Sequence, residues 1–234
     1  MRFAVSEKVF DVLNDVCFGV VVAKGISNVE EIPVISDMLV RNIAICEDRF
    51  EGKKVKDSPF MLPYREAFSK LGVNPNRYMC SIEALLTRIS KKKGFPSINP
   101  AVDLGNAISI KYNIPIGAHD LGTVRDILTV RFSEPDDHFI AFGETESEVP
   151  DVGELIYVSD HEVRTRRWTW RQSEVGKITD DTTSILFPLD GFRNFNEKEV
   201  IYARNELADC LKNLFNCNVV TGFVDSKNPV YQFD

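Results

Sequence analysis

Residues 94–120, GFPSINPAVDLGNAISIKYNIPIGAHD, carry the densest set of local structural signals in the chain. Proline disfavours helix in the residue before it, so Asn99 should be extended and should cap a helix that begins at Pro100. Asn113 should end that helix, because the proline two residues later blocks any continuation. The stretch therefore predicts a capped helix over 100–112.

Polar side chains mark one face of this helix and the segment that follows it. Asp103 and Asn106 are three residues apart and share a face, which indicates hydrogen bonding to something nearby. The chain then returns towards the helix with His119 and Asp120. An imidazole beside a carboxylate can position or activate water, although a lone histidine is more often a satisfied loop residue. His119 is the candidate catalytic residue.

The segment resembles the B3/B4 domain of the phenylalanyl-tRNA synthetase β subunit, the module that hydrolyses mischarged tRNA. The matching residues are Ile98, Asn99, Pro100, Val102, Asp103, Asn106, Pro115, Ala118 and Asp120. The likeness is clearest over 81–192, and the sequence most resembles the free-standing B3/B4 proteins, which carry the domain without a synthetase. The resemblance implies an α+β fold, with helices packed around a mixed or antiparallel sheet, in a single domain over 1–234.

The resemblance also bears on the chemistry of the site. The synthetase's editing histidine precedes Ala-Phe-Asp, and its position here is Gly117. His119 stands two places later, where the synthetase has phenylalanine, so it either reaches the same water from a shifted register or does something else. The synthetase's glutamate for the tyrosine hydroxyl corresponds to Pro188, which cannot bind a phenol. Tyrosyl-tRNA is therefore not the expected substrate.

A second candidate segment is Trp168–Ser173, which replaces the synthetase's glycine-rich turn with Arg171 and Gln172. Arginine beside aromatic residues suits phosphate contact and base stacking, and core packing of the tryptophans is an equally good explanation. The resemblance assigns Asn99 and Pro100 to the structural motif. The expected substrate-binding residues are Asp103, Asn106, Asp120, Trp170, Arg171, Gln172, Asp181 and Thr182.

Composition limits the function classes. A net charge of −7 argues against a broad, sequence-independent grip on nucleic acid, although basic clusters occur at 53–56, 91–93 and 164–171. No apolar run is long enough to span a bilayer and no secretion signal is evident, so a cytoplasmic protein without a membrane partner is expected. Five cysteines without a CxxC pair, and only three histidines, favour reduced thiols and predict no metal or other cofactor.

Hydrophobic periodicity and turn residues predict the remaining elements. Strands are expected over residues 17–24, 127–132, 139–142, 155–159, 163–170, 184–189 and 219–224, after a first short strand and a helix or turn within 1–16. Helices are expected over about 30–50, 62–71, 81–92 (with Ser81 as N-cap) and 195–215 (with Asn196 as N-cap). The tail over 225–234 is expected to lie on the surface.

Three functions remain open at this point. The first is a trans-acting deacylase that cleaves the ester of a mischarged aminoacyl-tRNA, for which the resemblance makes a basic or non-proteinogenic amino acid plausible. The second is a non-catalytic module that binds a tRNA acceptor end or an amino acid, and the third acts on a small metabolite. The deacylase requires His119 and Arg171 to meet at one solvent-reachable hollow. No P-loop, HExxH or GxSxG motif supports other hydrolytic chemistry.

Overall fold

The computed structural model describes residues 1–29 and 31–234. Its helices are α1 Glu7–Val12, α2 Pro33–Phe50, α3 Leu62–Lys70, α4 Ser81–Ser90, α5 Pro100–Tyr112 and α6 Glu197–Phe215, with short 3₁₀ turns η1 Val55–Asp57 and η2 Leu121–Thr123. Its strands are β1 Arg2–Val5, β2 Val16–Lys24, β3 His119–Asp120, β4 Ile127–Phe132, β5 Phe139–Ile140, β6 Ser147–Glu148, β7 Leu155–Ser159, β8 Glu162–Arg166, β9 Arg171–Gln172, β10 Ser184–Phe192, β11 Asn218–Val224 and β12 Val230–Gln232.

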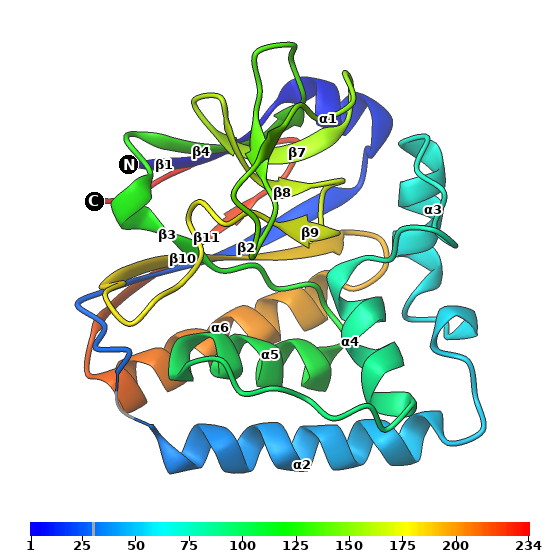
Figure 1. Cartoon of the computed structure of the whole chain (residues 1–234), viewed down its shortest axis with the longest axis vertical. Coiled ribbons are helices and arrows are strands. Elements are labelled where there is room, and N and C mark those ends of the chain that lie inside the picture. The colour runs from blue at the N-terminus through cyan, green and yellow to red at the C-terminus, as the bar shows by residue number, and fades with distance from the viewer. Residues whose placement is uncertain (30) are drawn as a thin grey trace.

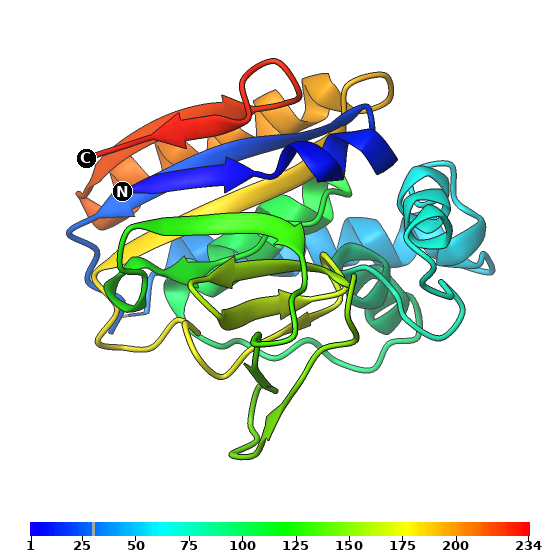
Figure 2. The ribbon, with the colours of Figure 1, turned by 90° about the horizontal axis from the view of Figure 1, so that it is seen from above.

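Within the described residues, the strands form two main sheets, of orders β12-β1-β4-β7-β8-β9 and β11-β2-β10-β3, and the hairpin β5-β6. Strands β1 and β4 run parallel, whereas their other neighbours pair antiparallel. Figure 1 shows the sheet that contains β2 and β10 between the other sheet and the helices, with α5 and α6 against it and α2 outermost. Viewed from above, the two chain ends lie together, where β1 pairs with β12 (Figure 2). The predicted α+β fold is confirmed.

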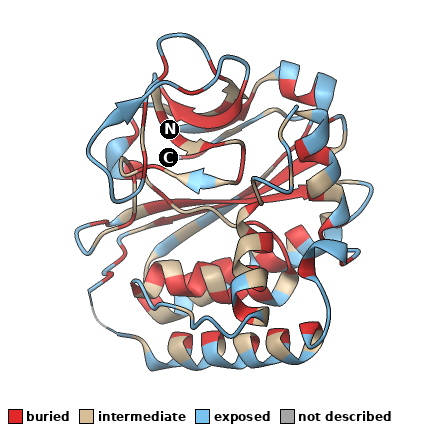
Figure 3. Cartoon of the chain, turned by 45° about the vertical axis from the view of Figure 1, so that its right-hand side comes forward, coloured by how far each residue is buried: buried red, intermediate tan, exposed pale blue. Residues whose placement is uncertain are grey.

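Alternation along β2 explains the layers. Phe18, Val20 and Val22 point into the core between the two sheets, whereas Val21 and Ala23 point towards α5 and α6. This is the period of two that a strand buried on both faces requires. Figure 3 shows the middle of the molecule in the colour of buried residues and the outer face of α2 largely exposed.

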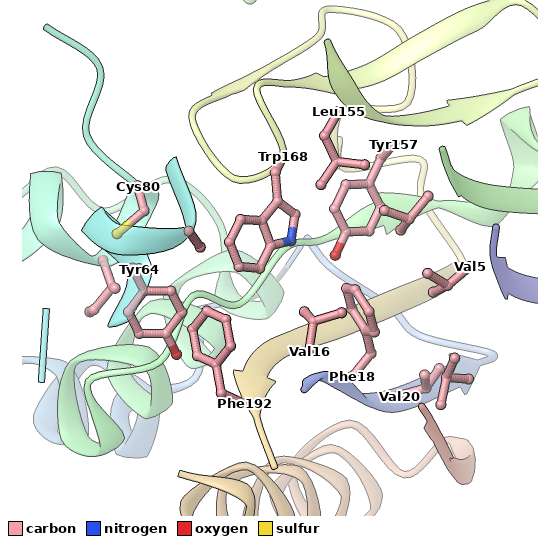
Figure 4. Packing of buried hydrophobic residues seen from close by; sticks show 14 of the residues in the cluster. Val5, Val16, Phe18, Val20, Tyr64, Cys80, Leu155, Tyr157, Trp168 and Phe192 are labelled. Atoms are coloured by element: carbon pink, nitrogen blue, oxygen red, sulfur yellow. The ribbon is translucent and has the colours of Figure 1, made fainter. Parts of the chain in front are cut away.

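The inter-sheet core also contains a group of aromatic side chains at its edge. Trp168 packs against Tyr64 and Phe192, as Figure 4 shows, and also against Phe68, with the three ring centroids 5.8–6.2 Å from its own. The side chain of Trp168 is fully buried. Trp168 is therefore part of the core, so core packing and not base stacking explains this tryptophan.

Most predicted elements are confirmed, and the clearest error lies at the end of β8. Strand β8 ends at Arg166, because Arg167 and Trp168 both adopt left-handed backbone conformations, with φ of 46° and 59°. The predicted strand over 163–170 is therefore wrong at its end, and tertiary packing of the tryptophan overrides local strand propensity. The tail lies largely on the surface as expected, where β12 pairs with β1 at the edge of the sheet and only Asp225 and Phe233 are buried.

The predicted helix caps have mixed outcomes. Helix α5 is capped as expected, but the N-cap of α4 is Cys80 instead of Ser81 and makes no side-chain capping bond. Asn196 is the N-cap of α6, yet its side chain bonds to Phe192 and Tyr64 instead of the helix. The predicted start of α2 at Glu30 lies outside the described residues, and the described helix begins at Pro33.

Candidate functional site

The start of α5 is organised by two side chains from its own segment. Asn99 Oδ1 accepts a hydrogen bond from the Val102 amide at 3.1 Å, and its Nδ2 donates to the Ile178 carbonyl at 3.3 Å. Asp103 accepts bonds from the Ile98 amide at 3.0 Å and from the Ser97 hydroxyl. Both side chains are buried, so they fix the helix start and the preceding loop. This is the structural role that the sequence favoured for Asn99 and left open for Asp103.

A cleft of about 400 Å³ opens beside this helix start. Its apolar walls include the exposed side chains of Ile98 and Phe142 and the buried ring of Phe187. Asn106 lines it from α5, and Gln172 lines it from β9. The remaining polar lining side chains are Asn99, Lys177, Thr179 and Asp180. The cleft therefore combines an apolar body with a few amide and charged groups, as small-ligand sites do.

His119 lies next to this cleft and does not line it. The side chain is only 1% exposed, and its ring stacks on Tyr157 with centroids 5.4 Å apart. Burial lowers the pKa of His119 to about 3, and the charge of Arg164 adds to the shift. Nδ1 has no hydrogen-bond partner among the described residues. The imidazole is therefore neutral at ordinary pH.

His119 and Arg171 line one small cavity of about 80 Å³. Ile116, Gly117 and Gln172 border both this small cavity and the main cleft. The deacylase hypothesis requires His119 and Arg171 to line the same cavity, and the structure places both residues there. That hollow has room for a few water molecules at most.

Gly117 lies between the His119 imidazole and the main cleft. A Cβ atom at this position would lie 3.2 Å from His119 Nε2 and 3.2 Å from Pro188 Cγ. The imidazole of His119 therefore reaches the space beside residue 117, where the resemblance places the editing histidine. The Gly117 amide bonds to the Pro188 carbonyl at 3.0 Å, which fixes this segment against β10.

Asp120, Thr182 and Asp181 lie away from both hollows. Asp120 accepts bonds from the Thr182 hydroxyl at 2.8 Å and the Gly122 amide at 2.7 Å. Thr182 is buried and Asp181 is exposed, and neither lines the main cleft. The carboxylate at the cleft is that of the neighbouring Asp180, which was not among the residues predicted to bind substrate.

The arginine cluster over 164–171 is mostly committed to ion pairs within the protein. Arg166 pairs with Glu154 at 2.8 Å and with Glu148, and its side chain is 7% exposed. Arg164 is buried and donates to the Thr123 carbonyl at 2.7 Å. These two side chains are consequently unable to form a phosphate-binding surface, whereas Arg171 is exposed.

Asp190 is a buried residue that the sequence gave no reason to select. It accepts bonds from the Tyr157 hydroxyl at 2.5 Å and the Trp168 indole at 2.6 Å. Burial raises the pKa of Asp190 to about 7, even though these two donors favour the carboxylate. It lines the small cavity together with His119. Its strand position, inside an apolar run, carried no signal of this role.

Other candidate chemistries have little support in the part of the chain that the structure describes. No group of three or more His, Cys, Asp or Glu side chains is arranged there to hold a metal ion. Burial raises the pKa of the Cys46 thiol to about 11, so this cysteine is unreactive. None of the described helices combines the length and apolar character needed to cross a membrane.

Comparison with known proteins places this chain in one domain family. The family model described as "B3/4 domain" matches residues 63–215, and the chain belongs to the B3/4 domain family. A solved N-terminal fragment of the phenylalanyl-tRNA synthetase β subunit from Pyrococcus horikoshii matches with a TM-score of 0.51 and 11% identity. This match covers 93% of the chain and 49% of the fragment, so the chain spans about half of the fragment's length. The chain matches no curated protein in sequence.

Proposed function

We propose that the chain is a trans-acting deacylase that hydrolyses the ester of a mischarged aminoacyl-tRNA in the cytoplasm. The observation that carries the proposal is the placement of the His119 imidazole beside Gly117, at the border of a cleft of about 400 Å³. A cleft of this size suits an aminoacyl group with its ribose. Membership of the B3/4 family and the fold shared with the synthetase fragment agree with it.

The cleft contains groups suited to holding an amino acid ester. The amides of Asn106 and Gln172 are candidate donors to the ester carbonyl or ribose hydroxyls, and Gln172 is itself fixed by a 2.7 Å bond to the Ala118 carbonyl. Asp180 is the candidate partner for the substrate's ammonium group. Preorganised donors of this kind lower the barrier because they do not reorganise during the reaction.

His119 suits the positioning of water better than the transfer of a proton. Its pKa of about 3 makes formation of the imidazolium costly at neutral pH. A neutral imidazole still offers one donor and one acceptor nitrogen, which is sufficient to orient a water molecule. An ester is an activated acyl group, so an oriented water and an oxyanion donor can hydrolyse it without a covalent intermediate.

The test is a panel of mischarged tRNAs that carry aromatic, basic and non-proteinogenic amino acids. We expect faster deacylation than in buffer for at least one of them, and no preference for tyrosine, because Pro188 cannot bind a phenol hydroxyl. Asn106→Ala should reduce turnover without unfolding the protein, since its half-buried side chain caps nothing. No acceleration over buffer for any amino acid would refute the deacylase.

A second function is favoured by the burial of His119. A side chain that is 1% exposed and reaches only a cavity of about 80 Å³ is a poor catalyst if that cavity stays closed. The chain would then bind an acceptor end or an amino acid without hydrolysis. Saturable binding of tRNA with no turnover by the wild type would support this function. His119→Asn separates the two functions, because only the deacylase loses activity while binding persists.

A further inference from the structure

A stack of arginine and aromatic side chains lies beside the small cavity. Tyr78 and Trp170 meet edge to face with ring centroids 4.9 Å apart. The Arg167 guanidinium lies 4.1 Å from the Tyr78 centroid and 4.8 Å from that of Trp170. Arg77 contacts Tyr78 at 5.2 Å, and Arg171 contacts Trp170 at 6.0 Å. We call these five residues the arginine–aromatic stack.

The charges of the stack are distributed unevenly. Arg167 is neutralised by Asp151 at 3.2 Å and Glu154 at 3.4 Å, and its side chain is only 10% exposed. Arg77 and Arg171 are exposed, and neither has an ion-pair partner among the described residues. The charge of Arg167 is therefore compensated within the protein, whereas Arg77 and Arg171 carry charge that no described residue compensates.

The backbone that holds Arg167 in the stack is strained. Arg167 and Trp168 adopt positive φ in succession, a conformation that costs side-chain-bearing residues on the order of 1–3 kcal/mol each. The Trp168 amide bonds to the Leu155 carbonyl at 2.6 Å and its indole bonds to Asp190, which keeps the turn in place. Strain of this kind persists when the surrounding structure determines it, so the backbone fixes the position of Arg167 in the stack.

The position of the stack connects it to the proposed reaction site. Trp170 and Arg171 line the small cavity with His119, and the next residue, Gln172, lines the main cleft. The Ser81 amide bonds to the Thr169 carbonyl at 2.7 Å, which ties the start of α4 to the turn between β8 and β9. A ligand that occupies the cleft and extends past Gln172 would meet the stack.

Planar cations and aromatic rings together are suited to unpaired nucleotides. Bases stack on aromatic rings and on guanidinium planes, and arginine also binds phosphate through paired donors. The net charge of −7 gives no general attraction to polyanions, so a local surface must supply it. We propose that the arginine–aromatic stack binds the unpaired 3′ nucleotides of an RNA whose terminal ester enters the cleft. This inference rests on the proposed function for the identity of that ester.

The experiment compares two hairpin RNAs, one with an unpaired 3′ tail and the same hairpin with a blunt end. Binding is measured by fluorescence anisotropy for the wild type, Arg77→Ala and Tyr78→Leu. The matched control is Arg125→Ala, which removes an 89% exposed arginine whose nearest carboxylate, on Asp160, is 3.7 Å away. A thermal midpoint for Arg77→Ala equal to that of the wild type shows that the variant is folded.

We expect Arg77→Ala and Tyr78→Leu each to weaken binding of the tailed hairpin by about fivefold or more, with no effect of Arg125→Ala. Arg77→Ala should also lower the salt dependence of binding by about one counterion. Arg77→Lys should recover only part of the affinity, because lysine keeps the charge but loses the stacking plane. Unchanged affinity in both stack variants, or equal loss for tailed and blunt hairpins, would overturn the inference.

Two further outcomes separate this inference from the proposed function. Hydrolysis of an aminoacyl ester of adenosine requires the cleft but not the stack, so Arg77→Ala should hydrolyse it at the wild-type rate. If no ester is hydrolysed but the stack variants lose affinity for the tailed RNA, the stack inference stands and the deacylase fails. If an acidic peptide displaces the tailed RNA from the wild type but not from Arg77→Ala, the partner is a protein and the inference fails.

Discussion

Two polar segments of this chain resembled ligand-binding segments in sequence, and they are built in different ways. In 97–106 most polar bonds are local, since Asn99 accepts from three residues ahead and Asp103 from five residues back, although Asn99 also donates to the distant Ile178 carbonyl. In 162–172 the partners are distant, with Arg166 bonded to Glu154 and the Trp168 indole bonded to Asp190. Local signals therefore identified the first segment correctly, whereas distant partners decided the second.

The largest expected effect tests the structural role of the second segment. Arg166→Ala should lower the free energy of unfolding by up to about 3–5 kcal/mol, because the buried Glu154 carboxylate loses the closer of its two arginine partners and keeps only Arg167 at 3.4 Å. Urea denaturation measures the change. Arg171→Ala, which removes an exposed arginine from the same cluster, is the control and should change stability by less than about 0.5 kcal/mol. Equal stability losses for the two variants would show that Arg166 is no more important for the fold than the exposed Arg171.

The second effect concerns two buried groups that line the same small cavity. The pKa of His119 is about 3 in the folded protein against an ordinary 6.5, so stability is lost as the pH falls below 6.5. The pKa of Asp190 is about 7 against an ordinary 3.8, so stability is lost as the pH rises above 3.8. Between about pH 4 and 6.5 the folded chain holds its proton on Asp190 and the unfolded chain holds it on His119. The two contributions therefore cancel in the wild type.

Single variants should reveal the two opposite slopes. Relative to the wild type, His119→Gln should become less stable as the pH rises through this window, by up to about 1.4 kcal/mol per pH unit. Asp190→Asn should become less stable as the pH falls, by a similar amount. Urea midpoints at several pH values measure both slopes. Parallel curves for the two variants and the wild type would show that neither group is shifted in the folded state.

The same contrast explains how much of the molecule could be predicted from sequence. The Asn99 cap of α5, the end of that helix at Asn113 and the buried strand β2 follow from residues within a few positions, and all three were predicted. The burial of Arg164, the turn at Trp168 and the role of Asp190 depend on partners that only the fold brings near. Asp181 and Thr182 were predicted to bind substrate, whereas the loop places their neighbour Asp180 at the cleft.

A third prediction compares two asparagines on the same helix. Asn99→Ala should lower stability by about 1–2 kcal/mol, because it removes the N-cap of α5 and the bond to the Ile178 carbonyl. Asn106→Ala should change stability by less than about 0.5 kcal/mol and act on ligand binding instead. Thermal denaturation and the deacylation assay together separate the roles. A larger stability loss for Asn106→Ala than for Asn99→Ala would contradict the assignment of Asn99 to the cap and of Asn106 to the cleft.

The smallest expected effect on stability addresses the imidazole beside Gly117. In Gly117→Ala the new methyl group would lie 3.2 Å from both His119 Nε2 and Pro188 Cγ, which requires a shift of a few tenths of an ångström. Because the backbone of Gly117 has no positive φ, the cost is steric and should be at most about 1 kcal/mol. If His119 orients water at this border, the same small shift should reduce deacylation far more than it reduces stability, since catalysis depends on sub-ångström placement. Gly105→Ala, where a methyl group meets only the Phe187 ring at an ordinary 3.7 Å, is the matched control in the same cleft. Equal turnover of the two variants would show that His119 takes no part in the reaction and is only a packed core residue.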